Sequence, residues 1–458
     1  MRSGGLCVAL TPESIDDVFQ ADIAGADWVE VRLDYLKEPQ SADHTRWDRF
    51  PVPVIATCRG ADRGGLFQGS IEEECTILET AVRNGAKLVD IEYEFFRPFD
   101  GAEVIASYHN FDNTPRDLES IIEEICATGA QIAKVATHVN RWADNRRLFE
   151  VMSRTWPKPL IVSGMGDMGQ ITRVAGPSRG SFLSYVSSGK ESAPGQVSLG
   201  EMLNAYKFRR IRKTTKLLGV LGMPVGHSQS HIIHNRGFDK CAVDFAYMKF
   251  PANAVEDFFE NAKACGIHGF SVTIPHKMSV IPLLNRVSPE ASKIGAVNTI
   301  SEIPEGWAGD NTDVDGVRAA LGSAGFDPTG KRVIILGRGG GAKAVAAALE
   351  GAKEITVLSR DEMAKFSAYE CDLLINATPV GMFPHVDESP VDGEILASTV
   401  FDLVYNPPIT RLLQNAKDQG KTIIQGTTML LAQAARQFEI WTGQPAPAEI
   451  YNAGWSIS

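Results

Sequence analysis

Residues 1–205 repeat one pattern eight times: a short β-rich apolar run, a polar junction and a segment with helical periodicity. The candidate strands are Leu6–Thr11, Trp28–Asp34, Val52–Arg59, Lys87–Tyr93, Glu103–Asn110, Gln131–His138, Pro159–Met165 and Ser181–Val186. Between them, apolar residues such as Leu118, Ile122 and Ile125 are spaced for helices that pack outside a parallel sheet. Eight βα units in this length predict a small closed (β/α)8 barrel.

A second α/β region begins at Leu217, after the basic segment 207–216, which we interpret as a domain junction. It divides near Thr329, where a Pro-Thr-Gly turn precedes the apolar run Arg332–Leu336. We therefore expect an α/β chain in which the barrel is followed by a two-domain region with a Rossmann-like part. The predicted domains are residues 1–213, 217–328 completed by about 436–458, and 329–435.

Charge and cysteine content exclude several classes of protein. Lys and Arg total 45 against 56 for Asp and Glu, and the resulting charge of −11 disfavours nucleic-acid binding. The seven cysteines are scattered and never form C-x-x-C, which indicates neither a disulfide framework nor a thiolate zinc site. No long apolar signal core opens the chain, and no window approaches the roughly 18–20 apolar residues that span a bilayer. We expect a cytoplasmic protein without a membrane segment.

Polar residues occur at or near the ends of the candidate barrel strands, where barrel enzymes carry their reactive groups. Lys134 lies inside the apolar run Ile132–Ala136, where burial favours the neutral amine and makes it a candidate nucleophile toward a carbonyl. A lysine paired with a carboxylate, or one that extends out of an edge strand, is the alternative. His109 on the neighbouring strand is a candidate acid and base, and Glu92 could orient its imidazole.

The first of the two following domains contains His227, His231 and His234, whose spacing suggests a metal site. We expect no metal there, because Ser228 and Ser230 at a strand-to-helix junction are better suited to hydrogen-bonding a carboxylate.

A glycine-rich turn follows the run Arg332–Leu336 and opens an alanine-rich helix. This arrangement is typical of a dinucleotide pyrophosphate site, with Gly337, Gly339, Gly340 and Gly341 as the candidate residues. The next strand, Glu354–Leu358, ends in Ser359 and Arg360, and an arginine at this corner favours the 2′-phosphate of NADP(H) over NAD.

Five motifs of the first domain resemble type I 3-dehydroquinate dehydratases over residues 5–212. They are Val29-Glu-Val-Arg-Leu-Asp34, Asp90-Ile-Glu92, Ser107-Tyr-His-Asn-Phe111, Ala133-Lys-Val-Ala136 and Ser192-Ala-Pro-Gly-Gln196. The resemblance implies that Lys134 forms an imine with the substrate ketone, that His109 moves the adjacent proton and that Glu92 holds His109. It also implies that Arg173 binds the substrate carboxylate. The remaining implied substrate contacts are Glu30, Arg32 and Arg59 around the polyol, and Ser192 and Gln196 on a closing loop.

The rest of the chain resembles shikimate dehydrogenases. The motifs are Gly222-Met-Pro-Val-Gly-His-Ser-Gln-Ser230, Gly269-Phe-Ser-Val-Thr-Ile-Pro-His-Lys277, Gly295-Ala-Val-Asn-Thr299 and Gly309-Asp-Asn-Thr-Asp313. The resemblance implies Lys277 and Asp313 as the catalytic pair. The implied substrate contacts are Ser228, Ser230, Thr273, Asn298, Tyr405 and Gln433, and the further implied cofactor contacts are Asn376, Thr378 and Gly426.

Together the two resemblances imply a bifunctional enzyme of the shikimate pathway. It would dehydrate 3-dehydroquinate to 3-dehydroshikimate and reduce this product to shikimate with NADPH. Dehydratase followed by dehydrogenase is the arrangement of plant and some bacterial enzymes, so a plastid protein without its transit peptide is an alternative to a cytoplasmic one. Two different functions stay open: a second half that acts on quinate or prefers NAD, and a regulator that senses these metabolites without catalysis. The oligomeric state cannot be derived from the sequence.

Overall fold

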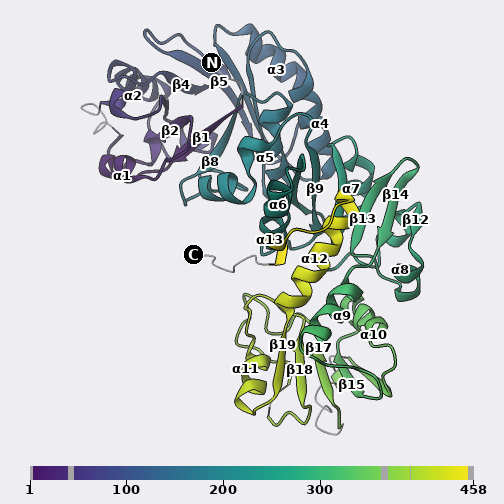
Figure 1. Cartoon of the computed structure of the whole chain (residues 1–458). Coiled ribbons are helices and arrows are strands. Elements are labelled where there is room, and N and C mark those ends of the chain that lie inside the picture. The colour runs from purple at the N-terminus through teal and green to yellow at the C-terminus, as the bar shows by residue number, and fades with distance from the viewer. Residues whose placement is uncertain (1–3, 40–45, 360, 363–369, 392, 452–458) are drawn as a thin grey trace. The chain divides into compact units, whose positions relative to one another are not determined.

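The computed structural model describes residues 4–39, 46–359, 361–362, 370–391 and 393–451 (Figure 1). The chain divides into two compact units. One comprises Met1–Leu217 and Asp244–Ile267, and the other comprises Leu218–Val243 and His268–Ser458. Among the described helices, none combines the length and the apolar character needed to cross a membrane.

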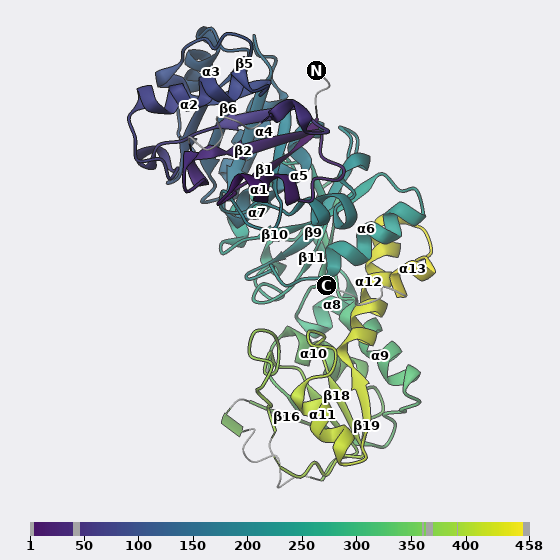
Figure 2. The same cartoon turned by 90° about the vertical axis from the view of Figure 1, so that its left-hand side faces the viewer.

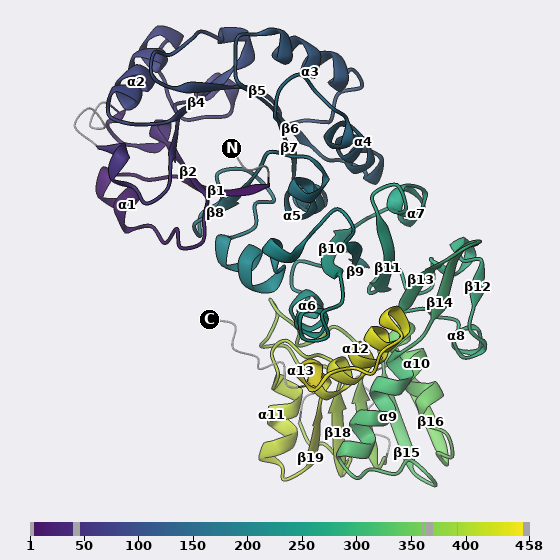
Figure 3. The ribbon, with the colours of Figure 1, turned by 45° about the horizontal axis from the view of Figure 1, so that its top comes forward.

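Eight parallel strands in the first unit confirm the predicted barrel, with the order β7-β6-β5-β4-β3-β2-β1-β8 and the helices outside (Figure 3). The strands are β1 (Gly5–Leu10), β2 (Trp28–Arg32), β3 (Val54–Thr57), β4 (Leu88–Glu92), β5 (Glu103–Asn110), β6 (Ile132–His138), β7 (Leu160–Met165) and β8 (Leu183–Ser187). The helices are α1 (Ile15–Gln20), α2 (Ile71–Arg83), α3 (Leu118–Ala127), α4 (Trp142–Ser153) and α5 (Gln170–Arg179). At the seam between β7 and β8, the Phe182 N–H donates to the Leu160 C=O at 2.8 Å, so the barrel is nearly closed.

Alternation along the strands stacks the barrel interior in layers, because every second side chain points inward. The layer nearest the amino ends is apolar and includes Ile55, Leu88, Ile105, Ile132, Ile161 and Leu183. Two residues further along, the same strand faces carry Thr57, Asp90, Ser107 and Lys134, all buried. The next inward positions hold Arg59, Glu92 and His109. The periodicity that builds the core therefore also collects charged side chains at the carboxyl ends of the strands.

Each barrel strand begins and ends within two residues of its predicted bounds. Strand β3 is shorter than the predicted run Val52–Arg59, since Pro51 and Pro53 lack the N–H that a ladder needs. The predicted helical stretch 199–206 forms a single π-helical turn, η7 (Glu201–Ala205). The other short turns of this unit are the 3-10 helices η1 (Leu33–Tyr35), η3 (Trp47–Arg49), η4 (Ala61–Arg63), η5 (Tyr93–Phe95), η6 (Asp167–Gly169) and η8 (Phe208–Arg210).

Strand β10 (Phe245–Pro251) and helix α7 (Val255–Ala262) belong to the same compact unit as the barrel. The ring of Trp142, the first residue of α4, packs edge-on against Phe250 and Phe258 at centroid distances of 5.5 and 4.7 Å. Its indole N–H donates to the Pro251 C=O at 3.0 Å, and its backbone N–H donates to Asp257. This unit is therefore larger than the predicted domain 1–213, and the domain boundaries stay predictions.

A six-stranded mixed sheet follows, with the order β10-β9-β11-β13-β14-β12. Its further strands are β9 (Lys216–Gly222), β11 (Ile267–Val272), β12 (Arg286–Val287), β13 (Thr299–Ile303) and β14 (Gly306–Asp310). The accompanying helices are α6 (Ser230–Lys240), α8 (Pro289–Ile294) and the 3-10 turn η9 (Ile281–Leu283).

The last sheet is parallel, with the order β16-β15-β17-β18-β19, and confirms the Rossmann-like part of the prediction. Its strands are β15 (Arg332–Leu336), β16 (Glu354–Leu358), β17 (Leu373–Asn376), β18 (Thr399–Asp402) and β19 (Thr422–Gln425). Its helices are α9 (Asp313–Ser323), α10 (Gly340–Ala348), α11 (Arg411–Asp418) and α12 (Gly426–Thr442), and the short α13 (Ala448–Tyr451) packs against α6 and α12. Helices α9 and α10 pack on one face and α11 on the other, and α12 lies along α9 (Figure 2).

Candidate active sites

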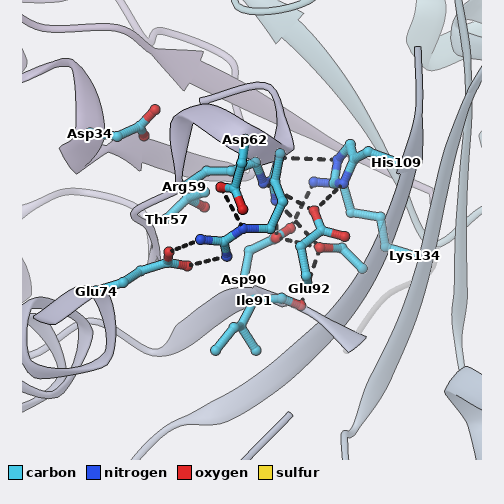
Figure 4. Close-up of polar contacts among 12 residues, drawn as sticks. Asp34, Thr57, Arg59, Asp62, Glu74, Asp90, Ile91, Glu92, His109 and Lys134 are labelled. Atoms are coloured by element: carbon cyan, nitrogen blue, oxygen red, sulfur yellow. Dashed lines mark hydrogen bonds and ion pairs between the residues drawn. The ribbon is translucent and has the colours of Figure 1, made fainter. Parts of the chain in front are cut away.

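Asp90, on β4, is the centre of a buried charge cluster in the barrel (Figure 4). Its carboxylate accepts from Arg59 Nη2 at 2.5 Å and from Lys134 Nζ at 2.7 Å, and it also accepts from the Ser107 hydroxyl at 2.8 Å. Register explains these contacts, because Ser107 and Lys134 are direct neighbours across β5 and β6. Burial alone would raise the pKa of Asp90, but Lys134 and Arg59 hold it well below its ordinary value.

Lys134 is buried, as predicted, but it is not isolated among hydrophobic groups. Besides Asp90, the Glu30 carboxylate lies 3.9 Å from Nζ, and the Tyr185 ring lies 4.3 Å from it. Thr57 donates to Glu30 at 2.9 Å and fixes that carboxylate. In the structure, Lys134 is therefore paired with a carboxylate, which is one of the alternatives that the sequence left open. The pairing holds Nζ in one place, which a positioned nucleophile also requires.

His109 lies between Glu92 and Arg59. Its Nδ1 is 2.7 Å from Glu92 Oε1, and its Nε2 is 3.1 Å from Arg59 Nη1. Because a guanidinium only donates, Nε2 must accept and Nδ1–H must donate to Glu92, which defines a neutral imidazole. Burial, helped by the charges of Arg59 and Lys134, lowers the pKa of His109 well below its ordinary value and agrees with that tautomer.

Glu92 combines burial with an ion pair. Its Oε1 lies 3.2 Å from Arg59 Nε. Burial raises its pKa to about 7, against the lowering effect of Arg59. The Glu92–His109 pair can therefore gain or lose a proton near neutral pH.

Two further arginines differ in their partners. Arg32 donates twice to Asp34, at 2.9 and 2.7 Å, so its guanidinium is engaged by a carboxylate two residues away. Arg173, on α5, donates from Nε to the Gly164 C=O at 3.0 Å, and within the described part of the chain no carboxylate forms an ion pair with it. Burial lowers the pKa of Arg173 to about 10. A buried guanidinium without a carboxylate is suited to an anionic ligand.

Ser192 and Gln196 lie on the loop after β8 and contact each other. The Ser192 backbone N–H and hydroxyl donate to Gln196 Oε1 at 2.8 and 3.2 Å. The loop is attached to the end of β7, where the Gly166 N–H donates to the Pro194 C=O. Both residues thus lie near the strand ends, and the closure of this loop over a substrate stays a prediction.

Sequence reasoning missed four partners of the barrel site, namely Asp90, Tyr185, Thr57 and Ser107. Asp90 could have been found from its spacing, because residues two apart on a strand share a face and Glu92 is a predicted site residue.

The second unit contains another lysine–aspartate pair. Lys277 Nζ donates to Asp313 Oδ2, and Asn298 Nδ2 donates to the other oxygen, Asp313 Oδ1, at 2.8 Å. Asp313 is the first residue of α9, and its backbone N–H donates to Asn311 Oδ1. Gln433 Oε1, from α12, lies 3.4 Å from Asn298 Nδ2. The structure thus brings together four of the predicted residues from distant parts of the chain.

The other predicted substrate contacts lie on neighbouring loops of this unit. Ser228 Oγ accepts from the Ser230 N–H at 3.3 Å and is hydrogen-bonded to the Tyr405 hydroxyl, whose pKa burial raises. Thr273 packs over Gly222, since a Cβ added there would lie 2.4 Å from Thr273 Cγ2.

The three histidines of the same unit differ from the metal pattern. His234 is fully buried, 5.2 Å from the Trp441 ring, and burial lowers its pKa to about 3. Among the described residues, no group of three or more His, Cys, Asp or Glu is placed to hold a metal ion.

The glycine turn at the end of β15 fits a dinucleotide. Gly337 has φ +109°, a conformation that side chains disfavour, and Gly339 is the N-cap of α10 with open space where a Cβ would be. Gly426 begins α12, where a Cβ would lie 2.5 Å from the Leu403 and Val404 carbonyls. Asn376 Oδ1 accepts from the Thr378 N–H and hydroxyl at 3.0 and 2.7 Å. The backbone can therefore approach a phosphate closely at Gly339, Gly340 and Gly341.

The end of β16 is where the sequence predicts the adenosine of the cofactor. Glu362 Oε2 accepts from the Ser359 N–H at 2.9 Å and from the Ser359 hydroxyl at 2.7 Å. Arg338, in the glycine turn, donates to the same oxygen at 2.9 Å. Arg360, the residue predicted to bind the 2′-phosphate, lies outside the described residues.

Comparisons with known proteins cover both units. The type I 3-dehydroquinase family matches residues 6–213, the shikimate dehydrogenase substrate binding domain matches residues 220–300, and the shikimate 5′-dehydrogenase C-terminal domain matches residues 426–450. The chloroplastic bifunctional 3-dehydroquinate dehydratase/shikimate dehydrogenase of Arabidopsis thaliana is 34% identical, with 99% of this chain and 84% of that protein covered. The chain belongs to this bifunctional family.

Other relatives match the dehydrogenase half of this family member. The shikimate dehydrogenase (NADP(+)) of Microcystis aeruginosa is 39% identical over 274 residues, which cover 52% of this chain and 96% of that protein. A crystal structure of a shikimate dehydrogenase in complex with NADP+ is 36% identical and covers 52% of this chain and 94% of that chain, with a TM-score of 0.49.

Proposed function

We propose that this chain catalyses two consecutive reactions. The barrel dehydrates 3-dehydroquinate to 3-dehydroshikimate, and the second unit reduces this product to shikimate with NADPH. The observation that carries the proposal is a positioned lysine in each unit: Lys134 on Asp90 beside an oriented, neutral His109, and Lys277 on Asp313.

In the barrel, Lys134 is the nucleophile. Its amine form attacks the ketone carbon, and loss of water leaves a protonated imine that acidifies the adjacent C–H bond. His109 Nε2 takes that proton while Glu92 accepts from Nδ1–H and stabilises the imidazolium. The same His109 returns the proton to the departing hydroxyl, which leaves as water. Hydrolysis of the imine releases 3-dehydroshikimate and restores Lys134.

Arg59 must change its contacts during this reaction. In the structure it donates to His109 Nε2, the atom that takes the substrate proton. The substrate therefore has to displace this hydrogen bond, after which Arg59 keeps its ion pairs with Asp90 and Glu92. Arg173 is suited to the substrate carboxylate because it is buried without an ion pair among the described residues. We assign Glu30, Arg32, Ser192 and Gln196 to the hydroxyl groups of the substrate and to the loop that covers it.

In the second unit, bound NADPH would supply the hydride for the carbonyl carbon. Lys277 Nζ donates the proton to the carbonyl oxygen, so that no free alkoxide accumulates. Asp313 holds Lys277 and is itself held by Asn298. We assign Ser228, Ser230, Thr273, Tyr405 and Gln433 to the carboxylate and hydroxyls of the substrate. The nucleotide would be held by the glycine turn Gly337–Gly341, by Ser359 and Arg360, and by Asn376, Thr378 and Gly426.

The partners that we propose are the small molecules of these reactions, and the net charge of −11 supports an absence of nucleic-acid binding. All seven cysteines are free thiols. We therefore propose a reducing compartment, the cytoplasm or alternatively a plastid.

A coupled assay tests the proposal. The protein is supplied with 3-dehydroquinate and NADPH, and the absorbances of the conjugated enone and of the reduced nicotinamide are followed together. We expect enone formation followed by NADPH consumption. Lys134→Ala should form no enone but still reduce added 3-dehydroshikimate, and Lys277→Ala should form the enone without consuming NADPH. Lys87→Ala and Lys331→Ala, which remove exposed lysines of each unit, are the matched controls.

Three outcomes would count against the proposal. If no enone forms while added 3-dehydroshikimate is still reduced, the barrel is inactive. If reduction occurs only with quinate-type substrates, the second substrate is assigned wrongly. If the folded protein binds these acids and catalyses neither step, the chain is a metabolite sensor.

A further inference from the structure

We propose that Glu362 determines cofactor specificity in the dehydrogenase half, because its carboxylate occupies the donors that would otherwise bind the 2′-phosphate of NADP(H). The inference rests on the proposed function, since it concerns the cofactor of that reaction. It predicts that the enzyme uses NAD(H) appreciably and that Glu362 weakens its preference for NADP(H).

The position of Glu362 supports this role. In sheets of this type, the ribose of the adenosine lies at the carboxyl end of the second strand, next to the glycine turn. In this chain that strand is β16, which pairs in parallel with β15 up to Leu358. The Gly337 N–H donates to the Leu358 C=O at 2.8 Å and joins the turn to the strand end. Glu362 lies between these two segments, bound to Ser359 on one side and to Arg338 on the other.

The donor set around Glu362 is the kind that binds a phosphate. A backbone N–H, a hydroxyl and a guanidinium converge on the single oxygen Oε2, at 2.9, 2.7 and 2.9 Å. Charge-assisted donors of this type bind carboxylate and phosphate oxygens alike. The carboxylate of Glu362 therefore stands where a 2′-phosphate oxygen would be expected, and a phosphate has to displace it or to lie beside it.

The negative charge of Glu362 affects the binding of NADP(H) and NAD(H) differently. The 2′-phosphate of NADP(H) is an anion and is repelled by a neighbouring carboxylate, whereas the neutral 2′-hydroxyl of NAD(H) can donate to it. The side chains of Arg338 and Glu362 are 61% and 40% exposed, so their ion pair is weak and can open. Glu362 thus lowers NADP(H) affinity without abolishing it.

The experiment measures binding of nucleotides to the whole protein by isothermal titration calorimetry. The probes are NADP+, NAD+ and the fragments 2′,5′-ADP and 5′-AMP, so the readout does not depend on catalysis. Glu362→Gln keeps the size of the side chain and removes its charge. We expect this variant to bind NADP+ and 2′,5′-ADP about tenfold more tightly, while NAD+ and 5′-AMP bind equally or less tightly. The gain should shrink as ionic strength rises.

Two further variants complete the test. Glu354→Gln removes an exposed carboxylate at the opposite end of β16 and should leave all four affinities unchanged. Adding Arg338→Gln to Glu362→Gln should cancel most of the gain for NADP+, since removal of Glu362 would free the Arg338 guanidinium for the phosphate.

An unchanged ratio of NADP+ to NAD+ affinity in Glu362→Gln would overturn the inference while leaving the proposed function intact. A wild-type protein that binds none of the four nucleotides would instead contradict the proposed dehydrogenase function itself.

Discussion

Each unit of this protein has a lysine on an aspartate, but the surroundings of the two pairs differ. The barrel pair, Lys134 and Asp90, has 6% and 0% of its side chains exposed and shares its space with Arg59, Glu92 and Glu30. The pair of the second unit, Lys277 and Asp313, has 18% and 6% of its side chains exposed, and Asp313 is otherwise hydrogen-bonded to the side-chain amides of Asn298 and Asn311. The first pair is part of a charge network, and the second is a single ion pair held by neutral groups.

The difference matches the chemistry that we propose for each lysine. A nucleophile that forms an imine has to be held still, and four neighbouring strands, β3 to β6, supply the groups that hold Lys134 and its base. A proton donor has to recover its proton from water after every turnover, and the more exposed Lys277 can do so. The same residue pair thus serves covalent catalysis in one setting and proton transfer in the other.

Replacing each lysine by arginine gives the largest contrast. Arginine keeps the positive charge but cannot form an imine with a ketone. Lys134→Arg should therefore bring dehydratase activity to background, whereas Lys277→Arg should lower dehydrogenase kcat by about 10²-fold and leave a measurable rate. Steady-state assays of the two half-reactions check this. Substantial dehydratase activity in Lys134→Arg would remove the proposed distinction between the lysines.

Replacing each aspartate by asparagine compares how much the two lysine–aspartate pairs contribute to the free energy of unfolding. Asp90→Asn leaves Lys134 and Arg59 buried with less compensating charge, and we expect a loss of about 3–5 kcal/mol in the free energy of unfolding. Asp313→Asn should cost only about 1–2 kcal/mol, since one partly exposed ion pair is lost. Urea unfolding followed by circular dichroism measures both losses. Equal losses would show that the buried charge network of the barrel depends on its aspartate no more than the single ion pair does.

The pH dependence of the dehydratase should report Glu92. Its carboxylate must be ionised to accept from His109, and burial raises its pKa to about 7. We expect kcat/KM of the dehydratase to rise about tenfold per pH unit up to about pH 7 and then to level off. Glu92→Gln should lower the plateau and remove the acidic limb, while the dehydrogenase profile stays unchanged. A limb that persists in this variant would assign the titration to another group.

The raised pKa of Glu92 also makes the stability of the folded protein depend on pH. Because the pKa of Glu92 is raised from 4.5 to about 7 on folding, the folded protein binds this proton more tightly than the unfolded chain does. The resulting stabilisation is fully present below pH 4.5 and is lost as the pH rises through 7.

The smallest expected effect is at the edge of the second site. Gln433 contacts Asn298 at 3.4 Å and does not touch Lys277 or Asp313 through any described hydrogen bond. Gln433→Ala should raise KM for 3-dehydroshikimate about fivefold with kcat nearly unchanged, because it removes substrate binding and not proton transfer. Gln414→Ala, on the surface of α11, is the control. A drop in kcat alone would place Gln433 in the chemical step.

Much of this architecture could be predicted from local pattern. The strands Glu103–Asn110, Arg332–Leu336 and Glu354–Leu358 have the predicted ends, because apolar runs there stop at polar junctions. Lys134, His109 and Glu92 could be selected because strand alternation places them near one end of a barrel. What the pattern could not provide is pairing between strands: the Lys134–Asp90 bond joins residues 44 positions apart, and its register depends on the folded sheet.

For two arginines, too, the sequence pattern does not predict the partners seen in the structure. The family resemblance implies that Arg32 contacts the substrate polyol, but in the structure the turn η1 places Asp34 against it with two hydrogen bonds. The resemblance implies the same contact for Arg59, whose guanidinium in the structure contacts Asp90, Glu92 and His109 on β4 and β5. Both roles toward substrate stay predictions, since each guanidinium must first exchange a protein partner for a ligand.

The most direct test of the account is to trap the imine. The wild-type protein is incubated with 3-dehydroquinate, treated with sodium borohydride and digested, and the modified lysine is located by peptide mass spectrometry. We expect a stable adduct on Lys134, no adduct on Lys277, and loss of the adduct in Lys134→Ala. An active dehydratase that yields no adduct, or that yields one on another lysine, would contradict this expectation.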